Sequence, residues 1–135
     1  MAGYSKRSLV DKLGIKAGYR AAILGSPPDY DSILGELPPR VKLGKDLRPE
    51  HDFVHYFCQS RRELEQKFPL LKSSLAHTGM LWISWPKASS GVTTDLNENV
   101  IREIGLKNGL VDVKVCAVDD TWSGLKFVYR VKDRK

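Results

Sequence analysis

Apolar runs suited to buried β-strands alternate along this chain with segments that carry helical signals. The runs at residues 19–25 and 53–58 are apolar or bulky on both faces, and a third run follows at residues 80–85. Strands that are apolar on both faces are typical of parallel sheets covered by helices on each side. Because parallel strands need long crossover connections, the alternation predicts a three-layer α/β fold with right-handed crossovers and a mostly parallel sheet.

Two further strand-like segments lie within residues 111–128. A compact polar loop at residues 119–124 joins them and carries two carboxylates, an indole and two hydroxyls. Two short strands joined by such a loop are typical of a β-hairpin. We therefore expect the sheet to end in a C-terminal antiparallel strand.

The first half of the chain carries weaker signals for short elements. Residues 8–13 predict a short helix with Ser8 as its cap and Gly14 as its end. Residues 29–37 support at most one short helix, because two prolines follow. Residues 41–43 are expected to form a brief edge strand.

The helix signals after the second apolar run are stronger. Ser60 and Glu63 fit a capping box, in which each side chain accepts a hydrogen bond from the backbone N–H of the other residue. Pro69 cannot sit inside a regular helix without a kink, so we expect two helical pieces, ended by a turn at residues 77–79. A single apolar stripe marks the buried face of these pieces: Leu64, Phe68, Leu71 and Leu75.

A last helix is expected before the hairpin. Thr94 or Asp95 is the candidate N-cap. Glu98 and Arg102 are four residues apart and can form an ion pair on the solvent side of this helix. Its core face would carry Leu96, Val100 and Ile104.

Length and composition favour one soluble domain spanning residues 1–135. The chain is 41% hydrophobic and 28% charged, and no apolar run approaches the ~20 residues of a membrane-spanning helix. Residues 1–7 lead into no apolar signal core, so secretion is not expected. Cys58 and Cys116 lie in strand-like runs, which predicts buried free thiols in a reducing, cytoplasmic compartment.

The net charge is +6, which favours an anionic small molecule or an acidic protein as the partner. The basic residues are scattered, and only the last ten residues resemble a cluster. Scattered basic residues are more often a solubility feature than a nucleic-acid footprint. Nucleic-acid binding is therefore not the expected function.

Polar residues gather in the loops that would follow the strands. Ligands of open parallel α/β sheets bind at the carboxyl ends of the strands, where the loops at residues 26–31, 59–62, 86–95 and 119–123 are expected to meet. The loop at 119–123 should face the loop at 86–95. The predicted ligand-binding residues are Ser26, Ser60, Trp85, Lys87, Thr94, Asp95, Asp119, Asp120 and Trp122.

Several of these residues have two interpretations. Asp119 and Asp120 suggest paired carboxylates for acid–base chemistry, but they also suit capping and shaping a turn. Neighbouring residues on a strand point to opposite faces, so only one would face the cleft. Trp122 is suited either to stack on a flat ligand or to cover the end of the sheet. We expect Trp82 in the core and Trp85 in the cleft.

The basic residues and histidines near these loops also allow more than one interpretation. Lys87 and the hydroxyls after it can hold an anion at a helix start, although a solvated loop explains the same residues. Arg61 and Arg62 lie in the first turn of a helix, where the dipole disfavours cations, and this hints at an acidic partner. His51 and His55 would be ~13 Å apart along a strand, so no metal site is expected.

Three strings resemble the bacterial domain of unknown function 3052 family. They lie at residues 82–87 (WISWPK), 94–96 (TDL) and 111–126 (VDVKVCAVDDTWSGLK). Residues 1–5 and 13–16 are similar to the start of that family. The resemblance implies a small bacterial protein and supplies no reaction.

The order of elements also resembles a truncated, Rossmann-like class I methyltransferase. Residues 80–85 look like its fifth strand, and residues 111–128 look like its sixth and seventh strands. Such enzymes carry a glycine-rich turn after the first strand and an acidic residue after the second. Here residues 24–28 contain one glycine and two prolines, which remove N–H donors. Residues 26–50 are too few for two strand–helix units, so no bound cofactor is expected.

The resulting functional expectation is a non-catalytic binding or regulatory module. It would bind an anionic small molecule or a protein partner at the carboxyl edge of its sheet. The alternative is a minimal S-adenosylmethionine-dependent methyltransferase with Asp119, Asp120 or Lys87 in its pocket. A nucleic-acid-binding protein is the second alternative and rests on charge alone.

Overall fold

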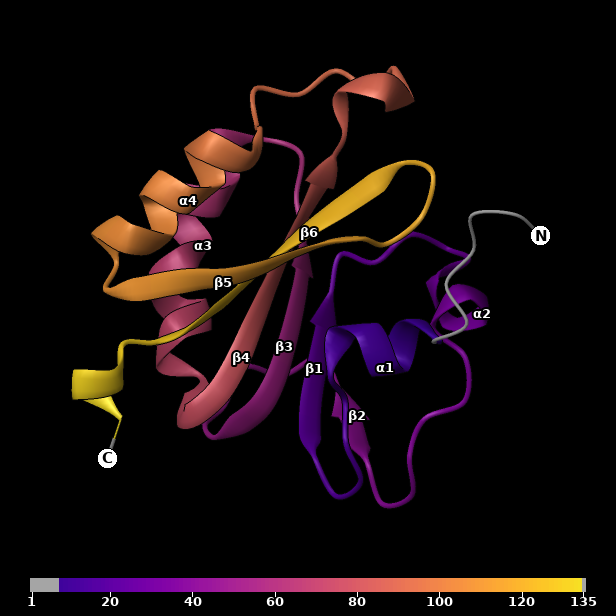
Figure 1. Cartoon of the computed structure of the whole chain (residues 1–135), viewed down its shortest axis with the longest axis vertical. Coiled ribbons are helices and arrows are strands. Elements are labelled where there is room, and N and C mark those ends of the chain that lie inside the picture. Colours follow the sequence, from indigo (N-terminus) through magenta and orange to yellow (C-terminus); the bar gives the residue numbers. More distant parts are fainter. Residues whose placement is uncertain (1–7, 135) are drawn as a thin grey trace.

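The computed structural model describes residues 8–134 (Figure 1). The expectations for residues 1–7 lie outside this described part of the chain. The strands are β1 (Arg20–Leu24), β2 (Lys42–Gly44), β3 (His51–Phe57), β4 (Leu75–Pro86), β5 (Leu110–Ala117) and β6 (Trp122–Tyr129). The helices are α1 (Leu9–Leu13), α2 (Tyr30–Leu34), α3 (Arg61–Ser73) and α4 (Glu98–Lys107), with short 3-10 turns η1 (Ala88–Ser90) and η2 (Val131–Asp133).

The strands form one six-stranded sheet in the order β2-β1-β3-β4-β6-β5. β2, β1, β3 and β4 pair in parallel. β6 lies antiparallel between β4 and β5. The prediction of a mostly parallel α/β sheet with a C-terminal antiparallel strand is confirmed, and so is the brief edge strand, which is β2.

Helices lie on both faces of the sheet, so the fold has three layers (Figure 1). α3 and α4 pack on one face around a core that includes Val54 and Phe127. α1 and α2 pack on the other face around a core that includes Phe53 and Trp82. Phe53 and Val54 are neighbours in β3 and point to opposite faces, as strand geometry requires. Apolar residues therefore occupy both faces of β3.

Two of the expected caps form as residue chemistry predicts. Ser8 accepts a hydrogen bond from the backbone N–H of Asp11, and Gly14 ends α1 with a φ of 89°. Ser60 Oγ accepts from the backbone N–H of Glu63 at 3.0 Å. The predicted reciprocal hydrogen bond, from Ser60 N–H to the Glu63 side chain, was wrong. The Glu63 carboxylate accepts from Gln59 N–H instead, at 3.4 Å.

The expected break at Pro69 was wrong. Residues Arg61–Ser73 form a single helix that contains Pro69. Pro69 and Leu70 lie on the exposed side, where water can satisfy the carbonyl that loses its partner. Burial of the opposite apolar stripe keeps the helix continuous.

Two other boundaries differ from expectation. Residues 77–79 belong to β4 instead of a turn. Gly79 allows this, because a Cβ there would lie 2.7 Å from the carbonyl oxygen of His51. The N-cap of α4 is Asn97, whose side chain accepts from Val100 N–H at 2.9 Å. Neither Thr94 nor Asp95 caps this helix, and both bind elsewhere.

The predicted burial of both cysteines is confirmed. Cys58 belongs to the core under α3 and α4, whereas Cys116 belongs to the core under α1 and α2. The sheet therefore separates the two thiols. None of the described helices combines the length and apolarity needed to cross a membrane.

Candidate ligand-binding edge of the sheet

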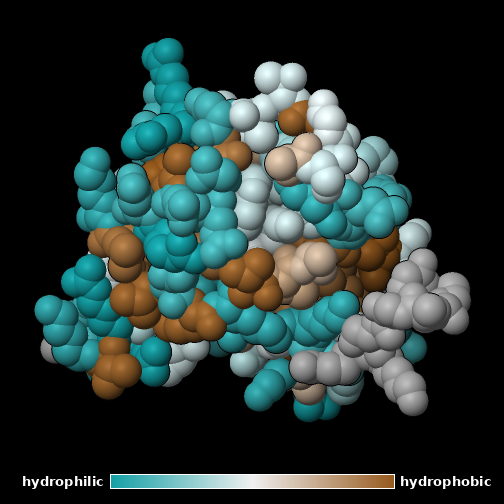
Figure 2. Space-filling view, turned by 45° about the horizontal axis from the view of Figure 1, so that its top comes forward, coloured by the Kyte–Doolittle hydropathy of each residue, from teal (hydrophilic) through white to brown (hydrophobic). Residues whose placement is uncertain are grey.

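The loops expected to form a site do follow the carboxyl ends of β1, β3, β4 and β5. β5 is antiparallel to β6, and β6 is antiparallel to β4, so the ends of β4 and β5 lie at the same edge. Pro86 pairs with Trp122, and Lys87 N–H donates to the Thr121 carbonyl at 2.8 Å. The 86–95 loop thus lies beside the 119–123 loop. Figure 2 turns the top of the molecule forward and shows pale, weakly polar residues beside brown apolar ones.

Two of the predicted site residues tie the loop before α4 to the start of α3, and a third caps α3. The Thr94 hydroxyl donates to the Gln59 carbonyl at 2.5 Å. Asp95 Oδ1 accepts from the backbone N–H of Arg61 at 2.8 Å, and Ser60 caps the same helix. A carboxylate at a helix N-terminus is stabilised by the free N–H groups there. These polar atoms hold two loops together.

The two neighbouring carboxylates of the β5–β6 loop differ in role. Asp119 Oδ1 accepts from the backbone N–H groups of Thr121 at 2.8 Å and Trp122 at 2.7 Å. Asp119 therefore shapes the turn, as an aspartate in a turn commonly does. Asp120 is exposed. Asp119 is thus bonded within the turn, whereas the Asp120 side chain forms no hydrogen bond within residues 8–134.

The two tryptophans at this edge pack against the protein itself. Trp85 is 6% exposed and belongs to the core under α3 and α4, so its expected place in a cleft was wrong. Trp82 and Trp85 are three residues apart on β4, so they point to opposite faces, and both faces are covered. Trp122 is half-buried and packs edge-to-face on Phe57 at 5.2 Å between ring centroids. It covers the end of the sheet.

The turn after β1 is shaped by contact with β3. Gly25 has a φ of 71°, and a Cβ there would lie 2.7 Å from the carbonyl oxygen of Phe57. The glycine is needed because the backbone of the protein itself approaches so closely. Ser26 follows it in an exposed position, and Pro27 accepts from Tyr30 N–H at the start of α2.

A buried polar network behind this edge was missed at the level of sequence. The Tyr30 hydroxyl and His55 Nδ1 share a hydrogen bond of 2.7 Å. His55 Nε2 and the Ser84 hydroxyl share another of 2.6 Å. All three side chains are at most 1% exposed. The only sequence signal was a histidine within an otherwise bulky strand.

The network contains a hydrogen-bonded serine and histidine, as a nucleophilic pair does, but a substrate could not reach them. A catalytic serine must reach a substrate, and Ser84 and His55 are both fully buried. Burial lowers the pKa of His55 to about 3, so the ring is neutral near pH 7. Burial also raises the pKa of Tyr30 above its usual value. The network satisfies buried polar groups within the core.

The charge of this edge opposes the charge of the whole protein. The loops at 26–31, 59–62, 86–95 and 119–123 together contain five carboxylates and three basic side chains, although the chain carries a net charge of +6. Excess positive charge must therefore lie elsewhere. Charge gives an anionic ligand no preference for this edge.

Comparison with solved structures identifies the class of fold. A SAM-dependent methyltransferase from Aquifex aeolicus matches with a TM-score of 0.61 and 15% identity, over 88% of this chain and 86% of that chain. A TehB-like SAM-dependent methyltransferase from Corynebacterium glutamicum matches with a TM-score of 0.57 and 12% identity, over 96% and 91%. Magnesium protoporphyrin IX methyltransferase from Synechocystis with bound SAH gives 0.56 and 14%, over 90% and 78%.

This protein therefore has the Rossmann-like fold of SAM-dependent methyltransferases. Identities of 12% to 15% show the fold alone. Comparisons with protein-family models and with curated proteins find no match. The resemblance to the domain of unknown function 3052 family consequently rests on the strings quoted above.

Proposed function

We propose that the protein is a non-catalytic binding module built on the methyltransferase-like fold. The observation that carries this proposal is a row of rings across the carboxyl edge of the sheet. Trp122 packs on Phe57, Phe57 packs on Tyr30 at 5.1 Å, and Tyr30 packs on His55 at 5.3 Å between centroids. Side chains of the protein itself occupy the carboxyl end of β3 and the start of the antiparallel β6, at the edge where ligands of open α/β sheets lie.

The end of β2, where a bound cofactor's ribose would lie, supports the same proposal. β2 ends at Gly44, which pairs with Ala22, so β1 extends two residues beyond it. Asp46 is the first acidic residue after β2, and it forms an ion pair with Arg48 at 2.5 Å. An acid that holds ribose hydroxyls must stand at the carboxyl end of the second strand. Here the strand stops short, and the first acid after it has another partner.

A titration tests this proposal directly. Isothermal titration calorimetry of the full chain with S-adenosylmethionine, and then with S-adenosylhomocysteine, should show no binding at micromolar concentrations. Micromolar binding of either compound would overturn the proposal. A thermal-shift screen of nucleotides, acidic metabolites and acidic peptides should then raise the melting temperature with a ligand of another class.

The second candidate is a minimal S-adenosylmethionine-dependent methyltransferase, and the structural comparisons favour it. The reported neighbours share the fold over at least 88% of this chain. Among the predicted site residues, Lys87 and Asp120 are the charged ones whose side chains form no hydrogen bond or ion pair within residues 8–134. This candidate predicts cofactor binding together with methyl transfer that is lost in Asp120→Ala or Lys87→Ala.

A further inference from the structure

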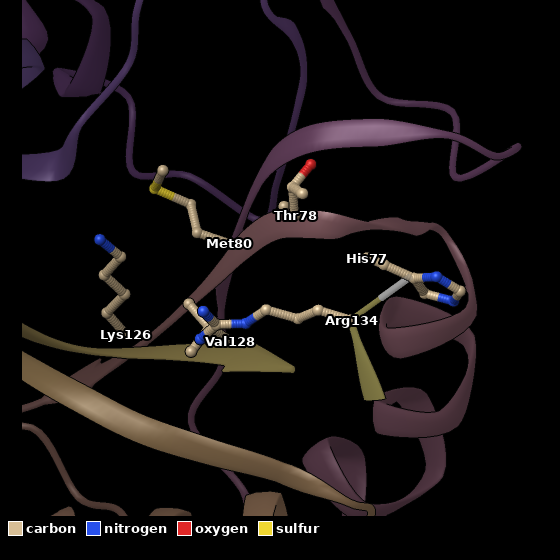
Figure 3. Close-up of a pocket in the computed structure, with 7 residues that line it drawn as sticks. His77, Thr78, Met80, Lys126, Val128 and Arg134 are labelled. Atoms are coloured by element: carbon tan, nitrogen blue, oxygen red, sulfur yellow. The ribbon is translucent and has the colours of Figure 1, made fainter. Parts of the chain in front are cut away.

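A pocket of about 190 Å³ lies away from the carboxyl edge, between the start of β4 and the second half of β6 (Figure 3). Thr78, Gly79 and Met80 form one side, and Lys126 and Val128 form the other. His77 and Arg134 complete the lining, and the Arg134 side chain runs toward Val128 (Figure 3). The pocket opens on the sheet face that α1 and α2 cover only in part.

The cations around this pocket have no acidic partners in the described part of the chain. The pKa of Lys126 is lowered first by its partial burial and then by the like charges of Lys114 and Lys16 nearby. Within residues 8–134, Lys114 Nζ donates to the Lys12 carbonyl alone, and Arg134 Nε donates to the Tyr129 carbonyl alone. None of the ion pairs formed within residues 8–134 includes these side chains. Such crowding of like charges costs free energy that a bound anion would recover.

We propose that this pocket binds a phosphate group. Lys126 supplies an ammonium, Arg134 a guanidinium and Thr78 a hydroxyl, and these are donors that phosphate oxygens accept from. Two cations line the pocket, and a doubly charged anion is attracted to two cations more strongly than a single carboxylate is. A second copy of this chain does not fit, because the same basic face would repel it.

The size of the pocket limits what the phosphate is attached to. Pockets that enclose a drug-sized ligand have volumes of ~300–1,000 Å³, and this pocket has about 190 Å³. It can hold a phosphate group but not a whole nucleotide, so the rest of the ligand must lie outside. The phosphate belongs either to a small phosphorylated molecule or to a nucleic-acid backbone.

Titration of the full chain with two probes tests the site. The probes are inorganic pyrophosphate and a ten-nucleotide single-stranded RNA, both at low salt. The variants are Lys126→Met, which keeps the apolar stem of the side chain, and Arg134→Gln on an exposed side chain. The matched control is Lys45→Met, which removes one exposed charge beyond β2 at the other end of the sheet. Thermal melts verify that each variant is folded.

We expect at least one probe to bind, with a dissociation constant about tenfold higher in each pocket variant and unchanged in Lys45→Met. Tighter binding of pyrophosphate would identify a small phosphorylated ligand, and tighter, steeply salt-dependent binding of RNA would identify a nucleic acid. The proposal is overturned if neither probe binds at millimolar concentration, or if Lys45→Met weakens binding as much as the pocket variants. Neither result depends on S-adenosylmethionine.

Discussion

The two faces of the sheet have cores of different chemistry. Under α3 and α4, Phe68, Leu81 and Phe127 are fully buried among aliphatic and aromatic side chains. Under α1 and α2, the core contains hydrogen bonds, from Trp82 Nε1 to the Leu13 carbonyl and within the Tyr30–His55–Ser84 network. The first face is stabilised by packed volume. The second also depends on hydrogen bonds between buried polar atoms, so it should respond to pH and to single-atom changes.

The apolar face should show the largest effect of a single substitution. Phe68 is fully buried, and its ring lies 5.7 Å from that of Phe127. Phe68→Ala should lower the free energy of unfolding by about 3–5 kcal/mol, because it removes buried area and leaves a cavity. Urea denaturation measures this loss. Leu70→Ala, on the exposed side of the same helix, is the control and should change stability by less than about 1 kcal/mol. Equal effects would contradict the contrast between the faces.

The polar face should make stability fall with decreasing pH. The pKa of His55 is about 3 in the folded protein, because burial disfavours its charged form, and about 6.5 in an unfolded chain. The unfolded state therefore binds the proton first as the pH falls. Stability from neutral His55 is complete above pH 6.5 and is lost toward pH 3, by up to about 1.4 kcal/mol for each pH unit.

Urea denaturation of the wild type and His55→Gln between pH 4.5 and 7 isolates this effect. The carboxylates and His51, whose pKa burial also lowers, remain in both proteins, so their contributions cancel in the difference. The wild type should lose stability more steeply than the variant. Parallel curves would show that His55 does not titrate in this way.

Removal of the Tyr30 hydroxyl from the polar face should lower the free energy of unfolding by a smaller amount. Tyr30→Phe removes the hydroxyl that bonds His55 Nδ1 and leaves that nitrogen buried without a partner. The expected loss is about 1–3 kcal/mol. Tyr19→Phe, at a half-buried tyrosine whose hydroxyl forms no hydrogen bond in the described chain, should change stability by less than about 0.5 kcal/mol. A neutral Tyr30→Phe would place the stability of this face in its apolar contacts instead.

The apolar face was also the more predictable from sequence. Its strands and helices follow hydrophobic periodicity, which a single chain displays directly. Pro69 was misjudged because its effect depends on which side of the helix is exposed. The Tyr30–His55–Ser84 network was missed because its members are 25 and 29 residues apart, so only the register of the sheet brings them together. Trp85 was misplaced because it is buried in the same core as Leu96, a residue of the segment before α4 that is distant from it in sequence.

The loop that joins β5 to β6 should show the smallest effect and distinguishes the two functional candidates. Asp119→Ala removes an acceptor from two backbone N–H groups and should cost about 1 kcal/mol. Asp120→Ala alters only an exposed side chain and should be neutral in urea denaturation. If Asp119 shapes the turn, its variant loses stability. A stable Asp119→Ala variant that loses S-adenosylmethionine binding would instead assign this carboxylate to a cofactor site and favour the methyltransferase candidate.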